Sequence, residues 1–179
     1  YGWIVERLCG AIQPDVAAGE APEVPDIDHD RPCATGDISI FTGKEVRDVL
    51  RSHVNCIVSD SSIWEQSAAF HLDKHPAVGA FVKNSGLNFA IPYLHNGEPK
   101  EYLPDFVVRL AGRGERYLIV ELKGADWENL AEVKAQAAHR WCAAINGTGA
   151  YGHWDFHLAW SVDALVKHLD TLVPAAAAA

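Results

Sequence analysis

The chain has 179 residues, of which 49% are hydrophobic and 22% charged, and its formal net charge at pH 7 is −9. This length and balance exclude an intrinsically disordered chain and indicate one globular domain with a core of its own. An acidic chain is also a poor general binder of nucleic acid, because phosphate affinity comes from Lys and Arg. The acidity is uneven, since residues 1–60 carry eleven of the 24 acidic residues and only five of the fifteen basic ones. The rest of the chain is closer to neutral.

The sequence has neither a membrane-spanning apolar run nor a signal peptide. Its four cysteines are scattered without a CxxC pair, which favours reduced thiols in a cytoplasmic protein over disulfides or a zinc site. We expect residues 1–35 to be an arm or linker from an upstream domain and residues 36–173 to be the folded domain. The alanine run over residues 174–179, in a chain that lacks Met, is interpreted as an artefact.

Periodicity and turn residues predict the elements before residue 76. In chain order they are an amphipathic helix (3–12), a linker rich in Pro, Ala and Gly (13–35), a strand (37–42), a helix (43–53), a short strand (55–59) and a helix (62–74). The last helix is expected to end before Pro76, because proline interrupts helical hydrogen bonding.

The second half of the chain predicts a meander of strands followed by alternating helices and a strand. The expected elements are strands over 78–83, 89–94, 102–110 and 117–123, a helix over 127–146, a strand over 151–160 and a helix over 162–172. This order predicts an α/β/α sandwich around a mixed sheet of about five strands. The last strand is expected to lie parallel to the strand over 117–123, joined to it by a crossover helix.

Three ionisable residues lie at the ends of the hairpin over residues 102–124, YLPDFVVRLAGRGERYLIVELKG. Asp105 is near the start of the first strand, whereas Glu121 and Lys123 are near the end of the second. Antiparallel pairing brings these ends together, and alternation places Glu121 and Lys123 on the same face. Two carboxylates and a lysine at the end of an apolar hairpin are costly to desolvate and therefore indicate a function.

The chemistry that suits this cluster is hydrolysis assisted by a hard cation. Mg²⁺ prefers carboxylate and carbonyl oxygens, and Asp105, Glu121 and the backbone carbonyl of Leu122 could supply three of them. Lys123 could orient or deprotonate the attacking water, or offset charge on a phosphate. The simpler alternative is an ordinary cross-strand salt bridge at the rim of a sheet.

These residues also carry a family resemblance. Pro104-Asp105, followed sixteen residues after the Asp by Glu121-Leu122-Lys123, resembles the signature of the PD-(D/E)xK nuclease superfamily. The wider stretch from about Asp37 to His157, above all residues 52–72, 75–110 and 132–147, resembles the C-terminal nuclease region of type III restriction-enzyme subunits and related helicase–nucleases.

The resemblance implies a restriction-endonuclease-like fold and an endonuclease that cuts double-stranded DNA with Mg²⁺, for which Mn²⁺ substitutes. It also implies an upstream helicase domain, which alone would use ATP, and a methyltransferase subunit as a further candidate partner. Because this chain is acidic, we expect it to depend on partner domains for much of its DNA affinity.

Three further residues are candidates for the same site. Glu65 forms a capping-box pattern with Ser62, but the resemblance also places an acid from this helix at the metal, and both interpretations stay open. Lys134 lies within the apolar stripe of the helix over 127–146, so it either snorkels past the core or contacts the scissile phosphate or a metal ligand. Gln136 flanks the stripe and either touches a phosphate or faces solvent.

Two alternative functions belong to other classes. The chain could be a catalytically inactive nuclease-fold domain that serves as a DNA-binding or assembly module. It could also be a metal-dependent hydrolase of some other substrate, although the sequence contains no signature of a substrate pocket. The presence of Asp105, Glu121 and Lys123 together favours an active nuclease.

Overall fold

The computed structural model describes residues 4, 34–52, 54–58, 63–95, 98–123 and 130–173. Apart from residue 4, the expected helix over 3–12 lies outside the described residues, as do nearly all of the expected arm over 1–35 and the alanine run over 174–179. Within them the elements are η2 (Thr35–Asp37), β1 (Val46–Asp48), β2 (Cys56–Val58), α2 (Ile63–Lys74), β3 (Val78–Lys83), β4 (Ile91–His95), β5 (Glu98–Tyr102), β6 (Phe106–Leu110), β7 (Arg116–Leu122), α3 (Leu130–Thr148), β8 (His153–Ala159) and α4 (Val162–Thr171).

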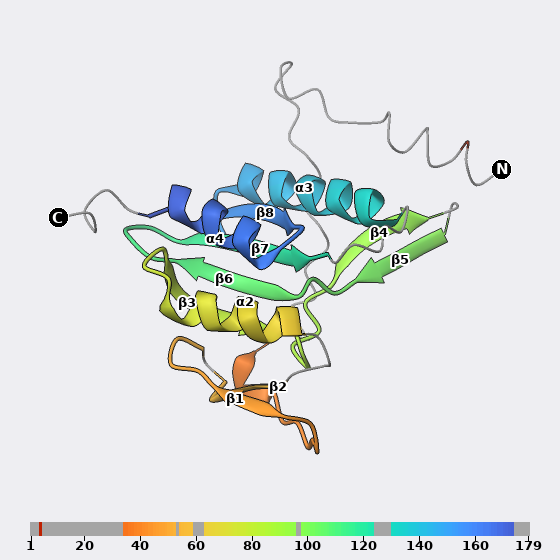
Figure 1. Ribbon diagram of the computed structural model, residues 1–179. Helices are drawn as coiled ribbons and strands as arrows, with labels where there is room; N and C mark the ends of the chain where they lie inside the picture. Colours follow the sequence, from red (N-terminus) through yellow and green to blue (C-terminus); the bar gives the residue numbers. More distant parts are fainter. Residues whose placement is uncertain are drawn as a thin grey trace.

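The central sheet has the strand order β3-β6-β7-β8 (Figure 1). β6 pairs antiparallel with both β3 and β7, whereas β7 pairs in parallel with β8. The predicted hairpin is thus confirmed, and so is the parallel last strand that follows a helical crossover. The chain is mixed α/β, but its described central sheet has four strands, fewer than the expected number of about five.

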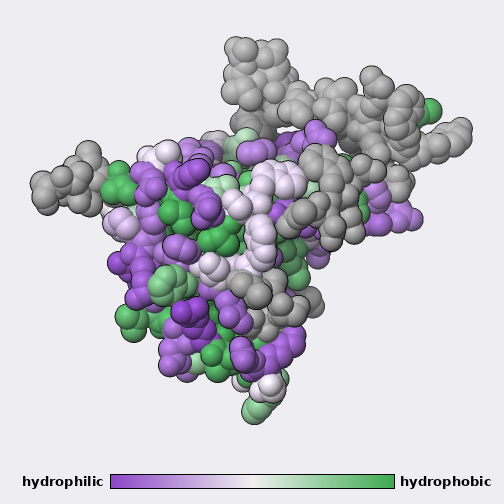
Figure 2. All heavy atoms as spheres, viewed as in Figure 1, coloured by the Kyte–Doolittle hydropathy of each residue, from purple (hydrophilic) through white to green (hydrophobic). Residues whose placement is uncertain are grey.

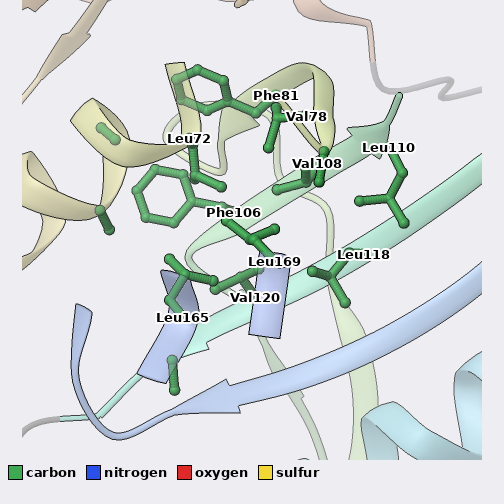
Figure 3. Packing of buried hydrophobic residues seen from close by; sticks show 14 of the residues in the cluster. Leu72, Val78, Phe81, Phe106, Val108, Leu110, Leu118, Val120, Leu165 and Leu169 are labelled. Carbon is green, nitrogen blue, oxygen red and sulfur yellow. The ribbon is translucent and has the colours of Figure 1, made fainter. Parts of the chain in front are cut away.

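Helices cover both faces of this sheet. One face, with Leu118 and Val120 of β7, packs against α2 and α4. The other face, with Ile119 between them, packs against α3. Alternation along β7 therefore divides the core into two clusters, one on each side. In Figure 3 Leu72 of α2 and Leu165 of α4 lie around Phe106, and all three are fully buried. Each such side chain contributes about 1.5–3 kcal/mol through burial.

The hairpin of β4 and β5 stands apart from the central sheet. The two strands pair only with each other in a two-stranded sheet, and β4 packs against α3. The expectation of a continuous four-strand meander is therefore wrong, because β3 pairs directly with β6 and the hairpin lies between them in sequence. The expected strand over 102–110 is interrupted at Leu103 to Asp105. Pro104 has no backbone N–H for a ladder at this point.

The segment before α2 also differs from expectation. Residues 38–42 form no strand, and the expected helix over 43–53 is replaced by β1, which pairs antiparallel with β2. The amides of Leu50 and Arg51 both donate to Asp73 Oδ1 of α2, at 2.7 and 2.8 Å. This carboxylate accepts the hydrogen bonds that the two amides would donate to carbonyl groups within a helix. Tertiary contacts therefore override the local helical pattern.

The surface over β1 and β2 is partly hydrophobic. Phe41, Val46 and Leu50 are exposed, and Figure 2 shows hydrophobic residues in green between hydrophilic ones in purple in this lower region. None of the helices in the described part of the chain has the length and hydrophobicity needed to cross a membrane.

Candidate functional site

Asp105 is fixed at the point where three strands of the central sheet end or begin. Its Oδ2 accepts a hydrogen bond of 2.7 Å from the Leu122 amide at the end of β7. Its own carbonyl accepts one of 2.8 Å from the Asn84 amide, just after β3. The interruption of the chain at Pro104 thus places Asp105 between the ends of β3 and β7. One backbone amide holds its carboxylate and another holds its main chain, so the position of Asp105 does not depend on a flexible side chain.

Glu121 lies beside Asp105 on β7. The antiparallel register pairs Phe106 with Val120, which places Asp105 opposite Glu121 one position further on. Glu121 is only 7% exposed, and its Oε1 lies 3.2 Å from Lys123 Nζ. Its other oxygen, Oε2, is buried without a hydrogen-bond partner among the residues that the structure describes. Buried carboxylate oxygens normally have a partner, so this atom is an acceptor that a ligand could use.

The two carboxylates disfavour each other's charge. Burial, and next the Asp105 carboxylate, raise the pKa of Glu121 to about 7, although Lys123 and Lys134 oppose this. Burial also raises the pKa of Asp105 against the lowering effect of the Leu122 amide hydrogen bond, and the Glu65 carboxylate raises it further. A cation bound between the two carboxylates would lower both pKa values, because it favours the ionised form of both groups.

Glu65, the third candidate acid for the metal, forms an ion pair with Lys83. Its Oε2 lies 2.7 Å from Lys83 Nζ, which also donates to the Val58 carbonyl at 3.0 Å. Lys83 pairs with Phe106 in the ladder, so its side chain lies on the face covered by α2 and α4. The capping-box alternative involves Ser62, which lies outside the described residues.

Lys83 was missed by the sequence analysis. It ends an apolar run just before the Asn-Ser-Gly turn, a position that is typical of a solvent-exposed lysine. The structure buries it to 7% exposure, and its partners come from β2 and α2. The one sequence signal is that the strand alternation gives Lys83 the same face as the core residue Phe81.

Lys134 and Gln136 occupy different sides of α3. Lys134 is half-buried, its Nζ lies 5.8 Å from the centroid of the Tyr102 ring, and its charge lowers the pKa of Glu121. It therefore lies on the side of α3 that faces the cluster. Gln136 is exposed and lies roughly 200° further around the helix. The predicted contacts of both residues with a phosphate stay predictions.

The donor set determines which metal could bind. The described residues contain no group of three or more His, Cys, Asp and Glu arranged to hold a metal ion. A metal would therefore be bound by the two carboxylates of Asp105 and Glu121, completed by carbonyl oxygen and water. Mg²⁺ is held in this way, with one or two carboxylates and several waters, whereas structural zinc sites need four protein ligands.

No protein-family model, no curated protein and no solved structure matches the chain. The residues of the site are therefore what indicates its function.

Proposed function

We propose that this chain is a PD-(D/E)xK endonuclease domain with a restriction-endonuclease-like sandwich fold, which hydrolyses DNA phosphodiester bonds with Mg²⁺. The observation that carries the proposal is the pair of half-buried Asp105 and buried Glu121, where β6 starts and β7 ends, with Lys123 beside it. Glu121 supports it further, because its Oε2 is buried without a partner among the described residues. Such a cluster is costly unless a cation binds there.

The residues have separate roles in this proposal. When bound, Mg²⁺ would activate a water molecule and stabilise negative charge on the phosphate. Asp105 and Glu121 hold the ion, and the Leu122 carbonyl completes the protein ligands. The Leu122 amide keeps the Asp105 carboxylate in place through its hydrogen bond of 2.7 Å. Lys123 is 29% exposed, so its ammonium group reaches both Glu121 and the solvent side, where it orients the attacking water.

Glu65 and Lys134 are secondary members of the site. Glu65 becomes a metal ligand only by exchanging its contact with Lys83 for the ion, which makes it a weaker candidate than Asp105 and Glu121. Lys134 supplies positive charge toward Glu121 from α3 and is assigned to the scissile phosphate. Gln136, which is exposed, is assigned to a neighbouring phosphate.

The proposed context is a cytoplasmic restriction-type helicase–nuclease. Double-stranded DNA is the substrate, and an upstream helicase domain and a methyltransferase subunit are the proposed partners. We expect DNA binding to depend on these partners. The formal net charge of −9 supports this, since the chain has few cations to hold DNA by itself.

The test is incubation of the chain with supercoiled plasmid and Mg²⁺ or Mn²⁺, with EDTA and Glu121→Gln as controls. Nicked or linear DNA that forms only with metal, and is absent with Glu121→Gln, supports the proposal. If wild type and Glu121→Gln leave the plasmid intact but both retain it in a mobility-shift assay, the chain is instead an inactive DNA-binding module.

A further inference from the structure

Tyr102 lies at the base of the β4–β5 hairpin, three residues before Asp105. It is the last residue of β5, pairs with Ile91 of β4 and is only 5% exposed. Its side chain belongs to the core cluster on the α3 face, together with Ile119 of β7. Glu121 is two residues after Ile119 on the same strand, and alternation gives it the same face. Tyr102 and Glu121 therefore project into one layer between the sheet and α3.

Two polar atoms in this layer are buried without hydrogen-bond partners among the described residues. They are the Tyr102 hydroxyl oxygen and Glu121 Oε2. More than nine in ten buried polar groups in proteins have a partner, so two such atoms in one layer are unusual. Each carries an uncompensated desolvation cost while it lacks one. The cost is explained if the two atoms form a hydrogen bond with each other when a metal ion is bound.

The surroundings keep Tyr102 in its hydrogen-bond-donating form. Burial raises the pKa of its hydroxyl, and the Glu121 carboxylate, the Cys142 thiol and the Asp105 carboxylate raise it further. A neutral tyrosine has one O–H donor, and Glu121 Oε2 is an acceptor. Lys134 Nζ lies 5.8 Å from the centre of the Tyr102 ring and also lowers the pKa of Glu121, which places the ring close to that carboxylate.

We propose that Tyr102 is a positioning residue for Glu121, whose hydroxyl donates the hydrogen bond that holds the Glu121 carboxylate in its metal-binding orientation. This inference depends on the proposed function, because it assigns the orientation to a metal ligand. Carboxylates that bind metals are themselves hydrogen-bonded by neighbouring groups, and loss of such a partner typically lowers metal affinity by about 10–100-fold.

The test is Tyr102→Phe, which removes one oxygen and keeps the ring beneath Lys134. Mn²⁺ and Mg²⁺ affinities are measured by calorimetry on the full 179-residue chain, alongside thermal unfolding in EDTA. We expect affinity to fall about 10–100-fold. The metal-free variant should unfold at the same temperature as wild type or higher, because it lacks an unsatisfied buried group. Excess metal should restore its rate of DNA cleavage.

Tyr93→Phe is the matched control. Tyr93 is a half-buried tyrosine on β4, and its ring centroid lies 6.3 Å from that of Tyr102. Its hydroxyl is not assigned to the site, so this variant should bind metal as wild type does.

Three results would overturn the inference, and they are distinguishable. If wild type binds metal, Glu121→Gln does not, and Tyr102→Phe binds as tightly as wild type, the positioning role is wrong and the proposed function stands. If wild type binds neither metal, or Glu121→Gln binds equally well, the proposed function fails and the inference with it. Lower metal-free stability of Tyr102→Phe would also contradict the inference, since it would indicate a structural role for the hydroxyl.

Discussion

Lys83 and Glu65 form an ion pair, with 2.7 Å between Nζ and Oε2, that joins the end of β3 to the first turn of α2. Lys83 is 7% and Glu65 20% exposed, so the pair is largely shielded from water. Both charges act on Asp105, since Glu65 raises its pKa and Lys83 lowers it. The pair therefore lies next to the candidate metal site, and Glu65 could bind the ion only by giving up its contact with Lys83.

Lys83→Met should destabilise the fold strongly. Removing one partner of a buried ion pair leaves the other charge uncompensated, which typically costs about 3–5 kcal/mol in the free energy of unfolding. The double variant Lys83→Met/Glu65→Leu should regain much of this loss, because an apolar pair of similar volume carries no desolvation penalty. Urea unfolding of both variants measures the effect.

Lys167→Met is a control for that experiment, because Lys167 is exposed on α4. It should change the free energy of unfolding by no more than about 0.5 kcal/mol. If Lys83→Met behaves like Lys167→Met, the ion pair does not stabilise the fold.

The raised pKa of Glu121 predicts a pH dependence of stability in the metal-free protein. The unfolded chain releases this proton near 4.5, the ordinary pKa of a glutamate side chain, whereas burial and Asp105 raise the pKa in the folded chain to about 7. The stabilising contribution of protonated Glu121 to the free energy of unfolding is therefore fully present below pH 4.5 and is lost as the pH rises to about 7. Its size is roughly 3 kcal/mol, at 1.36 kcal/mol for each unit of pKa. Glu121→Gln should remove this slope from urea unfolding curves measured between pH 4.5 and 7.5.

Mg²⁺ or Mn²⁺ should restore the stability that the wild-type protein loses as the pH rises to about 7. The ion binds the ionised carboxylate of the folded state, so it stabilises the fold by mass action at pH 7 and above. The melting temperature should rise with metal concentration for wild type and not for Glu121→Gln. An equal rise for both proteins would place the ion elsewhere.

The parts of the fold that could be predicted are those in which local pattern and tertiary contacts agree. β6 and β7 are β-branched, apolar runs around a polar turn, and α2 ends before Pro76 as expected. β5, Glu98–Tyr102, has the sequence EPKEY, which has no β-branched residue. It is a strand because it pairs with β4, and no sequence pattern within it reveals that pairing.

In the candidate site, too, only what local pattern and strand pairing determine could be predicted. Asp105, Glu121 and Lys123 were found because hairpin geometry alone brings the ends of two neighbouring strands together. Lys83 and Tyr102 were missed because their environment is provided by distant segments. Lys83 contacts residues of β2 and α2, and Tyr102 is covered by α3. Burial of this kind depends on how helices pack against the sheet, which a single strand does not encode.

Lys123→Ala should abolish DNA cleavage and leave the fold intact. Lys123 is 29% exposed and its contact with Glu121 is 3.2 Å long, so its loss should cost at most about 1 kcal/mol of stability. Lys100→Ala is the matched control, because Lys100 is exposed on β5 and should be dispensable for cutting. Plasmid cleavage and thermal unfolding are measured for both. An unfolded Lys123→Ala variant would show that this lysine has a structural role instead.

Lys134→Met should preserve stability and impair cutting. Lys134 is half-buried on α3, and methionine keeps a stem of similar length against the sheet while it removes the charge. The contact of Nζ with the Tyr102 ring, at 5.8 Å, contributes only about 0.5–1 kcal/mol, so the fold should tolerate the change. The positive charge of Lys134 near Glu121 would stabilise negative charge that develops on the phosphate, and its loss should slow cleavage at saturating Mg²⁺ by about 100-fold.

Arg140→Met, which removes an exposed charge from the same helix, should cut at the wild-type rate. If Lys134→Met cleaves as fast as Arg140→Met, the role of Lys134 is to pack against Tyr102, and phosphate recognition lies elsewhere.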